Sequence, residues 1–537
     1  MTPRFSIVTP VYNPPADVLR AMVQSIVRQS YGDWELCLVD DRSPEPHVWP
    51  VLTELAATDP RIRIARRDEN GGISRASNDA IAMATGEFIV LVDHDDVLVR
   101  EALSIVNHAL TVNDPVDYAY SDEAKLLPDG RVGFAFYKPD WSPERLRSHM
   151  YTCHVSVLRR TLVEEVGGFR PEFDGSQDHD LVLRVTERTD RIVHVPAMLY
   201  LWRVLAGSAA GVADAKPYAS EAGRRAVQEH CDRIGIAADV EILPVLGHYR
   251  VRRRLAVRPL VSIVIPSRGS SGHVRAQRRV HLLRALTSVL DDSTYDDIEV
   301  VLVLDRGTPD EVVDAVQQRG DERIRLVWFD GAFNFSAKMN QGVAASRGEV
   351  VVLLNDDVEV ITHDWLETML GLALEPDVGL VGCKLFFGDG TLQHGGHVYV
   401  GAKMLHSYVY YPGSEAGMAN LLGVERECSG VTAACAMLRR EVWEEVGGMT
   451  EHLPVNYNDV DLSLKVRDRG YRVLWTPHAT LFHYESSTRV VTFDESEYAF
   501  VDRRWGHVLR RDPYSNPNLD QSRGDWVVGR PPESWLG

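Results

Sequence analysis

Short apolar runs alternate with longer amphipathic stretches along much of this chain. The apolar runs have the length and β-branched content of buried strands, and they lie at Phe5–Thr9, Glu35–Asp40 and Phe88–Asp93. The stretches between them have helical spacing, at Ala16–Arg28, Val48–Ala57 and Ser74–Ala84. Strand–helix–strand alternation predicts an α/β domain with a mainly parallel central sheet that helices cover on both faces.

The same pattern returns in the second half of the chain. SIVTPVYN at 6–13 corresponds to SIVIPSRG at 262–269, and GEFIVLVDHDDVLV at 86–99 corresponds to GEVVVLLNDDVEVI at 348–361. LRRTLVEEVGGF and QDHDL then return, in the same order, as LRREVWEEVGGM and NDVDL. The second set of strands is expected at Val261–Ile265, Glu299–Asp305 and Val350–Asn355. Four ordered blocks predict one α/β domain used twice, with insertions in the second copy.

The repeat divides the chain into parts. We expect domains at 1–210 and 259–490, a connecting segment at 211–258, and a C-terminal helix and tail at 491–537. Helical spacing predicts helices at Lys216–Ile234 and Glu495–Leu509, and Val240–Leu255 has the pattern of a strand pair. The strand pair ends in a basic run, Arg250–Arg254, which is either a solvated edge or a contact for acidic lipid or a pyrophosphate-linked acceptor.

Composition restricts the function classes. The 537 residues exceed one domain of about 150 residues. With 58 Lys+Arg against 77 Asp+Glu, the net charge is −19, so we expect no nucleic-acid partner. The 6 cysteines form no C-x-x-C pair, which is typical of reduced thiols. The sequence shows no secretory signal and no apolar run of about 20 residues, so we expect a cytoplasmic protein, possibly peripheral at the inner face of the cell membrane.

Acidic residues follow the predicted strands directly. Asp93, Asp95 and Asp96 share one turn, where mutual repulsion raises at least one pKa unless a cation such as Mg²⁺ or Mn²⁺ is bound. Asp40 and Asp41 end the neighbouring strand, at the edge where ligands of parallel sheets bind. The alternative is an acidic surface turn that caps the next helix.

Two further segments have candidate chemistry. Asn70-Gly71-Gly72 precedes a helix that carries Arg75, an arrangement that favours an anion or serves as an ordinary loop and cap. Asp178, in QDHD, lies at a predicted helix start, where it would act as a general base or as an N-cap.

Together these motifs resemble a known family. The PVYN start, the VDDRS turn, the N-G-G…R-x-x-N segment, the D-x-D turn and the VGGF…QDHD block are similar to family 2 of the nucleotide-sugar glycosyltransferases, which has the GT-A fold. The tandem arrangement resembles bacterial enzymes that build O-antigen, capsule or rhamnose-rich polysaccharides.

In the first copy, the resemblance implies an inverting, metal-dependent transfer. Asp178 would be the catalytic base, and Asp95, helped by Asp93, would hold Mg²⁺ or Mn²⁺. The implied donor-binding residues are Pro10, Tyr12, Asn13, Asp40, Asp41, Asn70, Arg75 and Asp93. The stretch Tyr200–Arg203 has no histidine, so the metal would rest on carboxylates alone.

The second copy differs at several of these positions. Asp459 would be the base, and Asp357 with His483 would hold the metal. Asn355 replaces the first carboxylate of the acidic turn. The implied donor-binding residues are Pro266, Arg268, Asp305, Asn334, Lys338, Asn355 and Asp356.

The resemblance implies hexosyl or deoxyhexosyl transfer from a UDP- or dTDP-sugar to an oligosaccharide or lipid-linked acceptor, with one site in each domain. Three alternatives remain: a single catalytic domain beside an acceptor-binding or scaffolding one, a sugar nucleotidyltransferase, and a non-enzymatic assembly protein. Two histidines of the segment Gln393–His397 have a spacing compatible with zinc, but no Cys or Glu partner is evident, so we expect a loop at the acceptor cleft.

Overall fold

The computed structural model describes residues 2–205, 217–274, 277–401, 403–484 and 494–529. They form two compact units, Met1–Val251 and Arg252–Gly537. The predicted boundaries at 210–211 and 490–491 lie outside the described residues.

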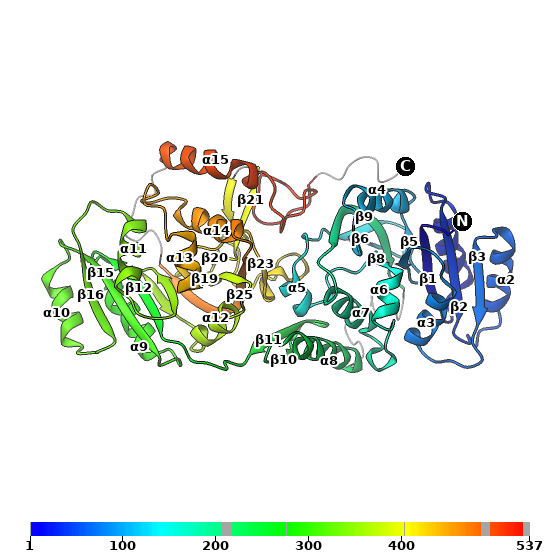
Figure 1. Ribbon diagram of the computed structural model, residues 1–537, viewed down its shortest axis with the longest axis horizontal. Helices are drawn as coiled ribbons and strands as arrows, with labels where there is room; N and C mark the ends of the chain where they lie inside the picture. The colour runs from blue at the N-terminus through cyan, green and yellow to red at the C-terminus, as the bar shows by residue number, and fades with distance from the viewer. Residues whose placement is uncertain (1, 206–216, 275–276, 402, 485–493, 530–537) are drawn as a thin grey trace. The chain divides into compact units, whose positions relative to one another are not determined.

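The sheet of unit 1 has the strand order β3-β2-β1-β4-β8-β6-β9-β5, with β7 beside β6 (Figure 1). The first four strands of that order run parallel, as predicted, whereas β8 is antiparallel to its neighbours β4 and β6. The strands are β1 (Phe5–Val11), β2 (Trp34–Asp40), β3 (Ile62–Arg66), β4 (Phe88–Leu91), β5 (Val97–Leu98), β6 (Tyr118–Leu126), β7 (Val132–Phe136), β8 (Ser156–Arg159) and β9 (Ile192–Arg203).

The sheet of unit 2 repeats this order as β16-β15-β12-β17-β24-β19-β25-β18, with β20 beside β19 and β23 beside β25. The predicted duplication is therefore also a duplication of topology. The strands are β12 (Val261–Ser267), β15 (Ile298–Asp305), β16 (Ile324–Phe329), β17 (Val350–Leu354), β18 (Val358–Val360), β19 (Val378–Phe386), β20 (Leu392–His394), β23 (Arg426–Glu427), β24 (Cys435–Arg439) and β25 (Arg472–His483). Two hairpins add β13 (Ser271–Val274) with β14 (Gln277–Val280), and β21 (His397–Val400) with β22 (Lys403–His406).

Helices cover both faces of the sheet in unit 1. Alternate residues of β1 enter opposite cores, since Ile7 packs with α1, α2 and α4 and Val8 packs with α3, α6, α7 and α8. The helices of unit 1 are α1 (Ala16–Val27), α2 (Val48–Thr58), α3 (Ile73–Met83), α4 (Ala102–Val112), α5 (Pro143–Ser148), α6 (Arg160–Glu165), α7 (Gln177–Thr186) and α8 (Pro217–Ile234). Those of unit 2 are α9 (His281–Asp291), α10 (Asp310–Gln318), α11 (Phe335–Ala345), α12 (Trp365–Ala373), α13 (Arg440–Val446), α14 (Asn458–Asp468) and α15 (Glu495–Leu509).

The segment predicted to connect the domains packs into unit 1. The helix α8 and the strands β10 (Ala238–Ile242) and β11 (Tyr249–Arg253) contribute side chains to the core around α7. Arg253 of the basic run is buried and pairs with Glu375 (2.9 Å) and Glu425 (2.8 Å). That guanidinium is therefore held by protein carboxylates instead of forming a solvated edge.

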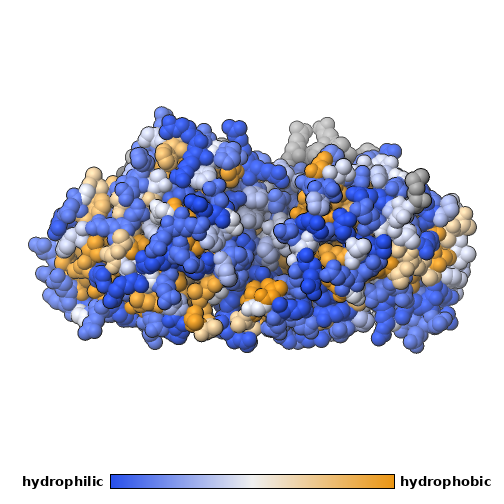
Figure 2. Space-filling view, in the orientation of Figure 1, coloured by the Kyte–Doolittle hydropathy of each residue, from blue (hydrophilic) through white to orange (hydrophobic). Residues whose placement is uncertain are grey.

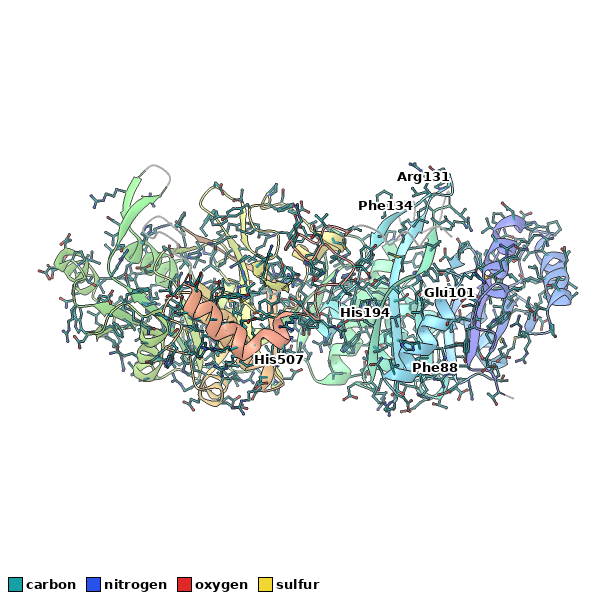
Figure 3. The ribbon with its side chains drawn as sticks, turned by 90° about the horizontal axis from the view of Figure 1, so that it is seen from above. Phe88, Glu101, Arg131, Phe134, His194 and His507 are labelled. Carbon is teal, nitrogen blue, oxygen red and sulfur yellow. The ribbon has the colours of Figure 1, made fainter. Side chains whose placement is uncertain are left out.

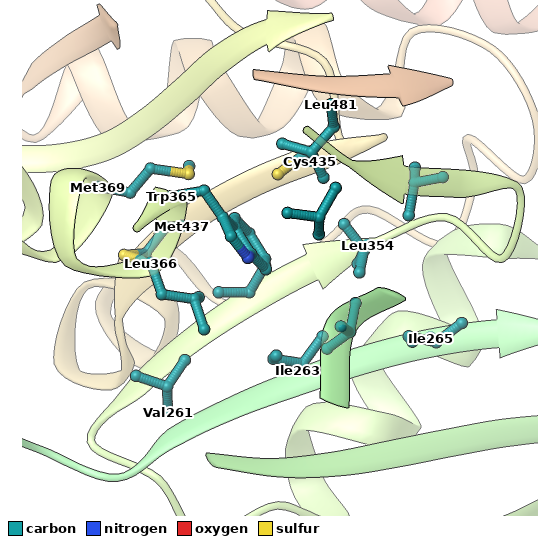
Figure 4. Close-up of a cluster of buried hydrophobic side chains, with 14 of the residues drawn as sticks. Val261, Ile263, Ile265, Leu354, Trp365, Leu366, Met369, Cys435, Met437 and Leu481 are labelled. Carbon is teal, nitrogen blue, oxygen red and sulfur yellow. The ribbon is translucent and has the colours of Figure 1, made fainter. Parts of the chain in front are cut away.

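The core of unit 2 is built on α12. Trp365 and Met369 of this helix belong to one buried cluster with Ile263 of β12, Leu354 of β17 and Met437 of β24 (Figure 4). The cluster fixes β12 and β17 side by side, so the residues that follow these two strands meet at one edge of the sheet.

A buried polar pair is repeated in both sheets. Ser6 Oγ donates to Glu35 Oε1 (2.7 Å) in unit 1, and Ser262 Oγ donates to Glu299 Oε1 (2.7 Å) in unit 2. Each serine also accepts from the backbone N–H of a glycine, Gly86 or Gly348. The pair satisfies buried polar groups at the beginning of the central strand and is conserved between the two copies of the domain.

The visible surface is mostly hydrophilic, with scattered apolar patches (Figure 2). Arg131 and Phe134 lie at the outer end of the β6–β7 hairpin (Figure 3), where Phe134 is 79% exposed. No helix among the described residues combines the length and the apolar character needed to cross a bilayer.

Packing predicts a clear contrast between two isoleucines of unit 2. Ile263→Ala in the core should lower the free energy of unfolding by about 2–5 kcal/mol, because the buried side chain leaves a cavity. Ile361→Ala, at a side chain that is 38% exposed, should change it by less than about 0.5 kcal/mol. Scanning calorimetry of the full chain measures both, and equal shifts for the two variants would contradict this core assignment.

Candidate active sites

Unit 2 has a cavity of about 590 Å³ at the carboxyl ends of β12 and β17. Ligands of parallel sheets bind at this edge. Seven of the residues predicted for donor or metal binding line the cavity: Pro266, Arg268, Lys338, Asn355, Asp356, Asp357 and His483.

Asp357 and His483 lie against each other in this cavity and are its candidate metal ligands. His483 Nε2 lies 3.1 Å from Asp357 Oδ1, because His483 ends β25 directly opposite Val358. Gln393 Oε1 lies 2.8 Å from His483 Nδ1, which leaves Nε2 to face Asp357 and the Asn355 amide (3.0 Å). Burial raises the pKa of Asp357, but His483, His281 and a backbone hydrogen bond together outweigh burial, so the pKa lies below its ordinary value. One carboxylate and one oriented imidazole fit a divalent ion.

Asp356 and Lys338 contribute a carboxylate and an ammonium group to the same cavity. Burial, with repulsion from Asp357, raises the pKa of Asp356 to about 7, and Ser267 Oγ donates to this carboxylate. Lys338 is buried at the cavity wall with its Nζ 2.8 Å from Asp305 Oδ1. A buried ammonium at the wall of this cavity suits an anionic ligand.

Two predicted donor residues of unit 2 have roles within the fold. Asn334 Oδ1 accepts from Ala337 N–H (2.9 Å), so Asn334 is the N-cap of α11, and its amide donates to Glu451 O (2.8 Å). Asp305 pairs with Lys338 and orients that side chain. Neither Asn334 nor Asp305 lines the cavity.

Asp459 lies on the first turn of α14, next to the cavity wall. Its carboxylate accepts from Thr432 and from the backbone of Ala433, both of which line the cavity. Burial raises its pKa. Asp461, two residues further, is fully buried and accepts from Trp505 Nε1 (2.8 Å) and Thr450 Oγ1 (2.6 Å). The second acid of the pair therefore anchors α14 to its neighbours, whereas the first lies beside the cavity.

Unit 1 gathers carboxylates at the corresponding turn after β4. Asp96 is buried, accepts from Tyr200 OH (2.6 Å) and from Arg203 N–H (2.7 Å), and thereby anchors the turn. Burial raises the pKa of Asp96 to about 8. Asp93 and Asp95 remain half-buried beside it, and burial also raises the pKa of Asp95.

The register of β5 and β9 places a tryptophan at the position of His483. Val97 pairs with Leu201, so Trp202 lies opposite Asp96, as His483 lies opposite Val358. The prediction that this stretch supplies no histidine holds. A histidine that the motifs did not indicate, His154, instead has its Nε2 3.8 Å from Asp93 Oδ2.

Asp178 and Asp180 of unit 1 differ in burial and pairing in the same way as Asp459 and Asp461 of unit 2. Asp180 is fully buried and paired with Arg170 and, at 2.7 Å, with Arg184. Asp178 is half-buried, and burial with the nearby Asp93 carboxylate raises its pKa to about 6. The structure therefore brings Asp178 within electrostatic reach of the acidic turn.

The other predicted donor residues of unit 1 line the same edge, and several are engaged with their own chain. Asp41 accepts from the N–H groups of Gly71 (2.9 Å) and Gly72 (2.8 Å), and its backbone oxygen accepts from Asn70. Asp40 is buried and pairs with Arg66 at 2.9 Å. The carboxylates thus shape the glycine loop, whereas Tyr12, at 48% exposed, and Arg75 face solvent.

Pro10 and Asn13 hold the first loop against its neighbours. The backbone oxygen of Pro10 lies 3.1 Å from His94 Nδ1, and Asn13 N–H donates to Ser43 Oγ (2.9 Å). Asn13 has a positive φ of 58°, a conformation that asparagine tolerates well.

Sequence comparison identifies the family of both units. The profile of glycosyl transferase family 2 matches residues 6–167 and 262–447, which together are more than half of the chain. The chain belongs to this family. The shared strand order and the acidic turns after β4 and β17 are accordingly those of two tandem GT-A-type domains, as the motifs predicted.

Two curated relatives match nearly the whole chain. An uncharacterized protein, y4gI, of Sinorhizobium fredii is 42% identical over 98% of this chain and 59% of its own length. The O-antigen biosynthesis protein RfbC of Myxococcus xanthus is 36% identical over 99% of this chain and 41% of its own length. The chain thus spans about half the length of these curated relatives.

Solved structures are similar at a lower level. S. aureus TarS 1-349 in complex with UDP-GlcNAc is 19% identical, with a TM-score of 0.35 over 42% of this chain and 66% of the other. The mannosyltransferase PcManGT from Pyrobaculum calidifontis, in complex with GDP-Man and Mn2+, is 18% identical, with a TM-score of 0.32 over 47% of this chain and 63% of the other.

The Asp357–His483 pair predicts where a divalent ion binds in unit 2. His483→Ala should weaken Mn²⁺ binding by more than the roughly 10–100-fold that loss of an outer-shell partner costs, because it removes a direct ligand. Titration followed by the electron paramagnetic resonance of free Mn²⁺ measures this. His507→Ala, at an exposed histidine of α15, is the matched control. Equal Mn²⁺ affinity in both variants would exclude His483 as a ligand.

Proposed function

We propose that this chain transfers sugars from nucleotide-sugar donors to a growing bacterial surface polysaccharide or lipid-linked oligosaccharide, with inversion at the anomeric carbon. The observation that carries the proposal is the cavity of unit 2, in which Asp357, His483 and Lys338 surround the space beside Asp459. The relative RfbC, by its name an O-antigen biosynthesis protein, supports the polysaccharide as the product. Its greater length makes the acceptor and the linkage part of the proposal.

In unit 2, the acidic turn and the lysine would bind the diphosphate of the donor. Asp357 and His483 would hold Mg²⁺ or Mn²⁺, which supplies positive charge against the departing diphosphate. Lys338, oriented by Asp305, adds a second positive charge at the cavity wall. Asn355 and Asp356 lie beside these groups, and the Ser267 hydroxyl orients the Asp356 carboxylate.

Asp459 would take the proton of the acceptor hydroxyl as that oxygen attacks the anomeric carbon. Its half-buried carboxylate, held by Thr432 and Ala433, has the raised pKa expected of a base in a poorly solvated site. A single in-line displacement of this kind needs no covalent nucleophile, and Thr432 and Ala433, which hold the Asp459 carboxylate, line the same cavity as Asp357 and His483.

In unit 1, we propose that Asp178 is the base, that Asp93 and Asp95 face the donor, and that Pro10, Tyr12, Asn13, Asp40, Asp41, Asn70 and Arg75 shape the donor site. Trp202 at the position of His483 favours a second possibility, in which unit 1 binds a divalent ion weakly and serves chiefly as an acceptor-binding domain. The two possibilities differ in whether unit 1 forms a linkage of its own.

A panel of UDP-, dTDP- and GDP-sugars with Mg²⁺ or Mn²⁺ tests the reaction class. Release of nucleoside diphosphate on addition of an acceptor is the expected result. Release of pyrophosphate would instead identify a sugar nucleotidyltransferase. No turnover of any donor with a competent acceptor would indicate a non-enzymatic role.

Substitution of the two bases tests the division of labour. Asp459→Asn should slow one linkage by about 10²–10⁴-fold, because an amide cannot accept the proton. Asp178→Asn should slow a different linkage if unit 1 is also catalytic. Mass spectrometry of the products distinguishes the linkages, with the exposed Asp468→Asn and Asp190→Asn as matched controls. The proposal fails if both base variants make the wild-type product at the wild-type rate.

The raised pKa of Asp178 predicts the pH dependence of unit 1. A base works in its ionised form, so transfer by unit 1 should decline as the pH falls through about 6, well above the ordinary pKa of an aspartate. The measurement uses Asp459→Asn, in which unit 2 is silent. A rate that stays constant to about one pH unit below that value would show that Asp178 is not the base.

A further inference from the structure

Three histidines of unit 2 that the proposed function does not use converge at the donor cavity, and one of them, His406, lines it. His394 ends β20, His397 begins β21, and His406 ends β22. One nitrogen from each ring lies within 4.8 Å of the others. The sequence expectation of a loop with no further ligand was incomplete, because His406 is supplied by the next strand.

The backbone explains why the rings meet. His397 and His406 are directly paired across the β21–β22 hairpin. His394 is brought against them by Gly395-Gly396, where Gly396 has a φ of +88° and a Cβ on Gly395 would come within 2.8 Å of Leu422. A sharp turn of this kind requires glycine. The cluster is thus built by a hairpin and a glycine turn of the inserted segment.

The rings are nearly perpendicular to one another, in T-shaped contacts, and none is stacked on another. The three centroid distances are 5.2 Å, 4.8 Å and 4.9 Å, with interplanar angles of 82°, 77° and 80°. His394 Nδ1 lies 2.8 Å from His406 Nδ1. Nitrogens that bind one zinc ion at about 2.0–2.1 Å lie about 3.4 Å apart, a spacing between the 2.8 Å of the His394–His406 pair and the 4.8 Å limit of the cluster.

The hydrogen bonding of His397 also indicates a missing partner. His397 is 5% exposed, and among the described residues its Nδ1 is a buried atom with no hydrogen-bond partner. Burial lowers the pKa of His397 to about 3, so the ring is neutral and keeps a lone pair. A buried nitrogen without a hydrogen-bond partner is unfavourable, and a metal ion is one partner that would satisfy it.

We propose that His394, His397 and His406 bind a transition-metal ion of the Zn²⁺ class, at a site separate from Asp357 and His483. Three imidazoles select zinc-like ions, whereas a site with a carboxylate accommodates Mg²⁺ or Mn²⁺. The nearest carboxylate is Asp459, whose Oδ2 lies 3.9 Å from His397 Nε2. An ion there would tie the β21–β22 hairpin to the end of β20.

The test is direct metal binding by the full chain, purified with a tag that contains no histidine. After removal of all metal with EDTA, the protein is dialysed against buffered Zn²⁺ and analysed for bound zinc, and Co²⁺ is used in parallel as a visible-absorption probe. We expect wild type, His483→Gln and His507→Gln (Figure 3) to retain one zinc that His397→Gln lowers to about a tenth or less. Zinc should also raise the melting temperature of wild type but not of His397→Gln.

Equal zinc in wild type and His397→Gln, or loss of zinc only in His483→Gln, would overturn the proposal. Should His397→Gln not fold, His406→Asn at a half-buried ring replaces it with the same two outcomes. Zinc binding is measured without any sugar transfer, so this experiment tests the zinc site independently of the proposed function.

Discussion

Like charges cannot be gathered at the end of a buried strand unless positive charge or hydrogen bonds compensate them, and both units gather carboxylates there. In unit 2 the compensation is explicit, since His483 lies 3.1 Å from Asp357 and Ser267 donates to Asp356. In unit 1 the tyrosine and backbone donors hold Asp96, and His154 lies 3.8 Å from Asp93. In unit 2, the pairing of β25 with β18 places His483 beside the acidic turn.

The duplication separates what the fold requires from what the chemistry requires. The buried Ser–Glu pair and the ion-paired second acid of each helix recur in both units, with Asp180 held by arginines and Asp461 held by Trp505 and Thr450. These groups stabilise the domain. The residue opposite the acidic turn differs, since Trp202 occupies in unit 1 the position that His483 occupies in unit 2. Two copies of one domain thus keep a framework while differing at this position.

Much of the fold followed from local pattern. The predicted helix Glu495–Leu509 is α15, and the predicted strands of the parallel half agree with β1, β2, β12 and β15 to within two residues at each end. The strand predicted to reach Asp93 ends at Leu91, because the acidic residues belong to the turn. The order of β8, β6 and β9 was not predictable in this way, since those pairings join segments far apart in the chain.

Site residues that belong to sequence motifs were predictable, whereas those that tertiary contacts bring to the site were not. The resemblance indicated His483 and Asp357, but Gln393, which orients His483, comes from an insertion whose position in space no periodicity encodes. Asn334 was predicted to bind the donor, yet local geometry makes it a helix cap. His154 reaches Asp93 from a segment that no motif marked.

The central claim is that the two ligand atoms of Asp357 and His483 share one cation with a nucleoside diphosphate. Anomalous diffraction from crystals grown with Mn²⁺ and a nucleoside diphosphate tests it most directly. The account predicts an anomalous peak between Asp357 Oδ1 and His483 Nε2, in contact with the diphosphate. A diphosphate bound elsewhere in unit 2, or a peak remote from this pair, would contradict it.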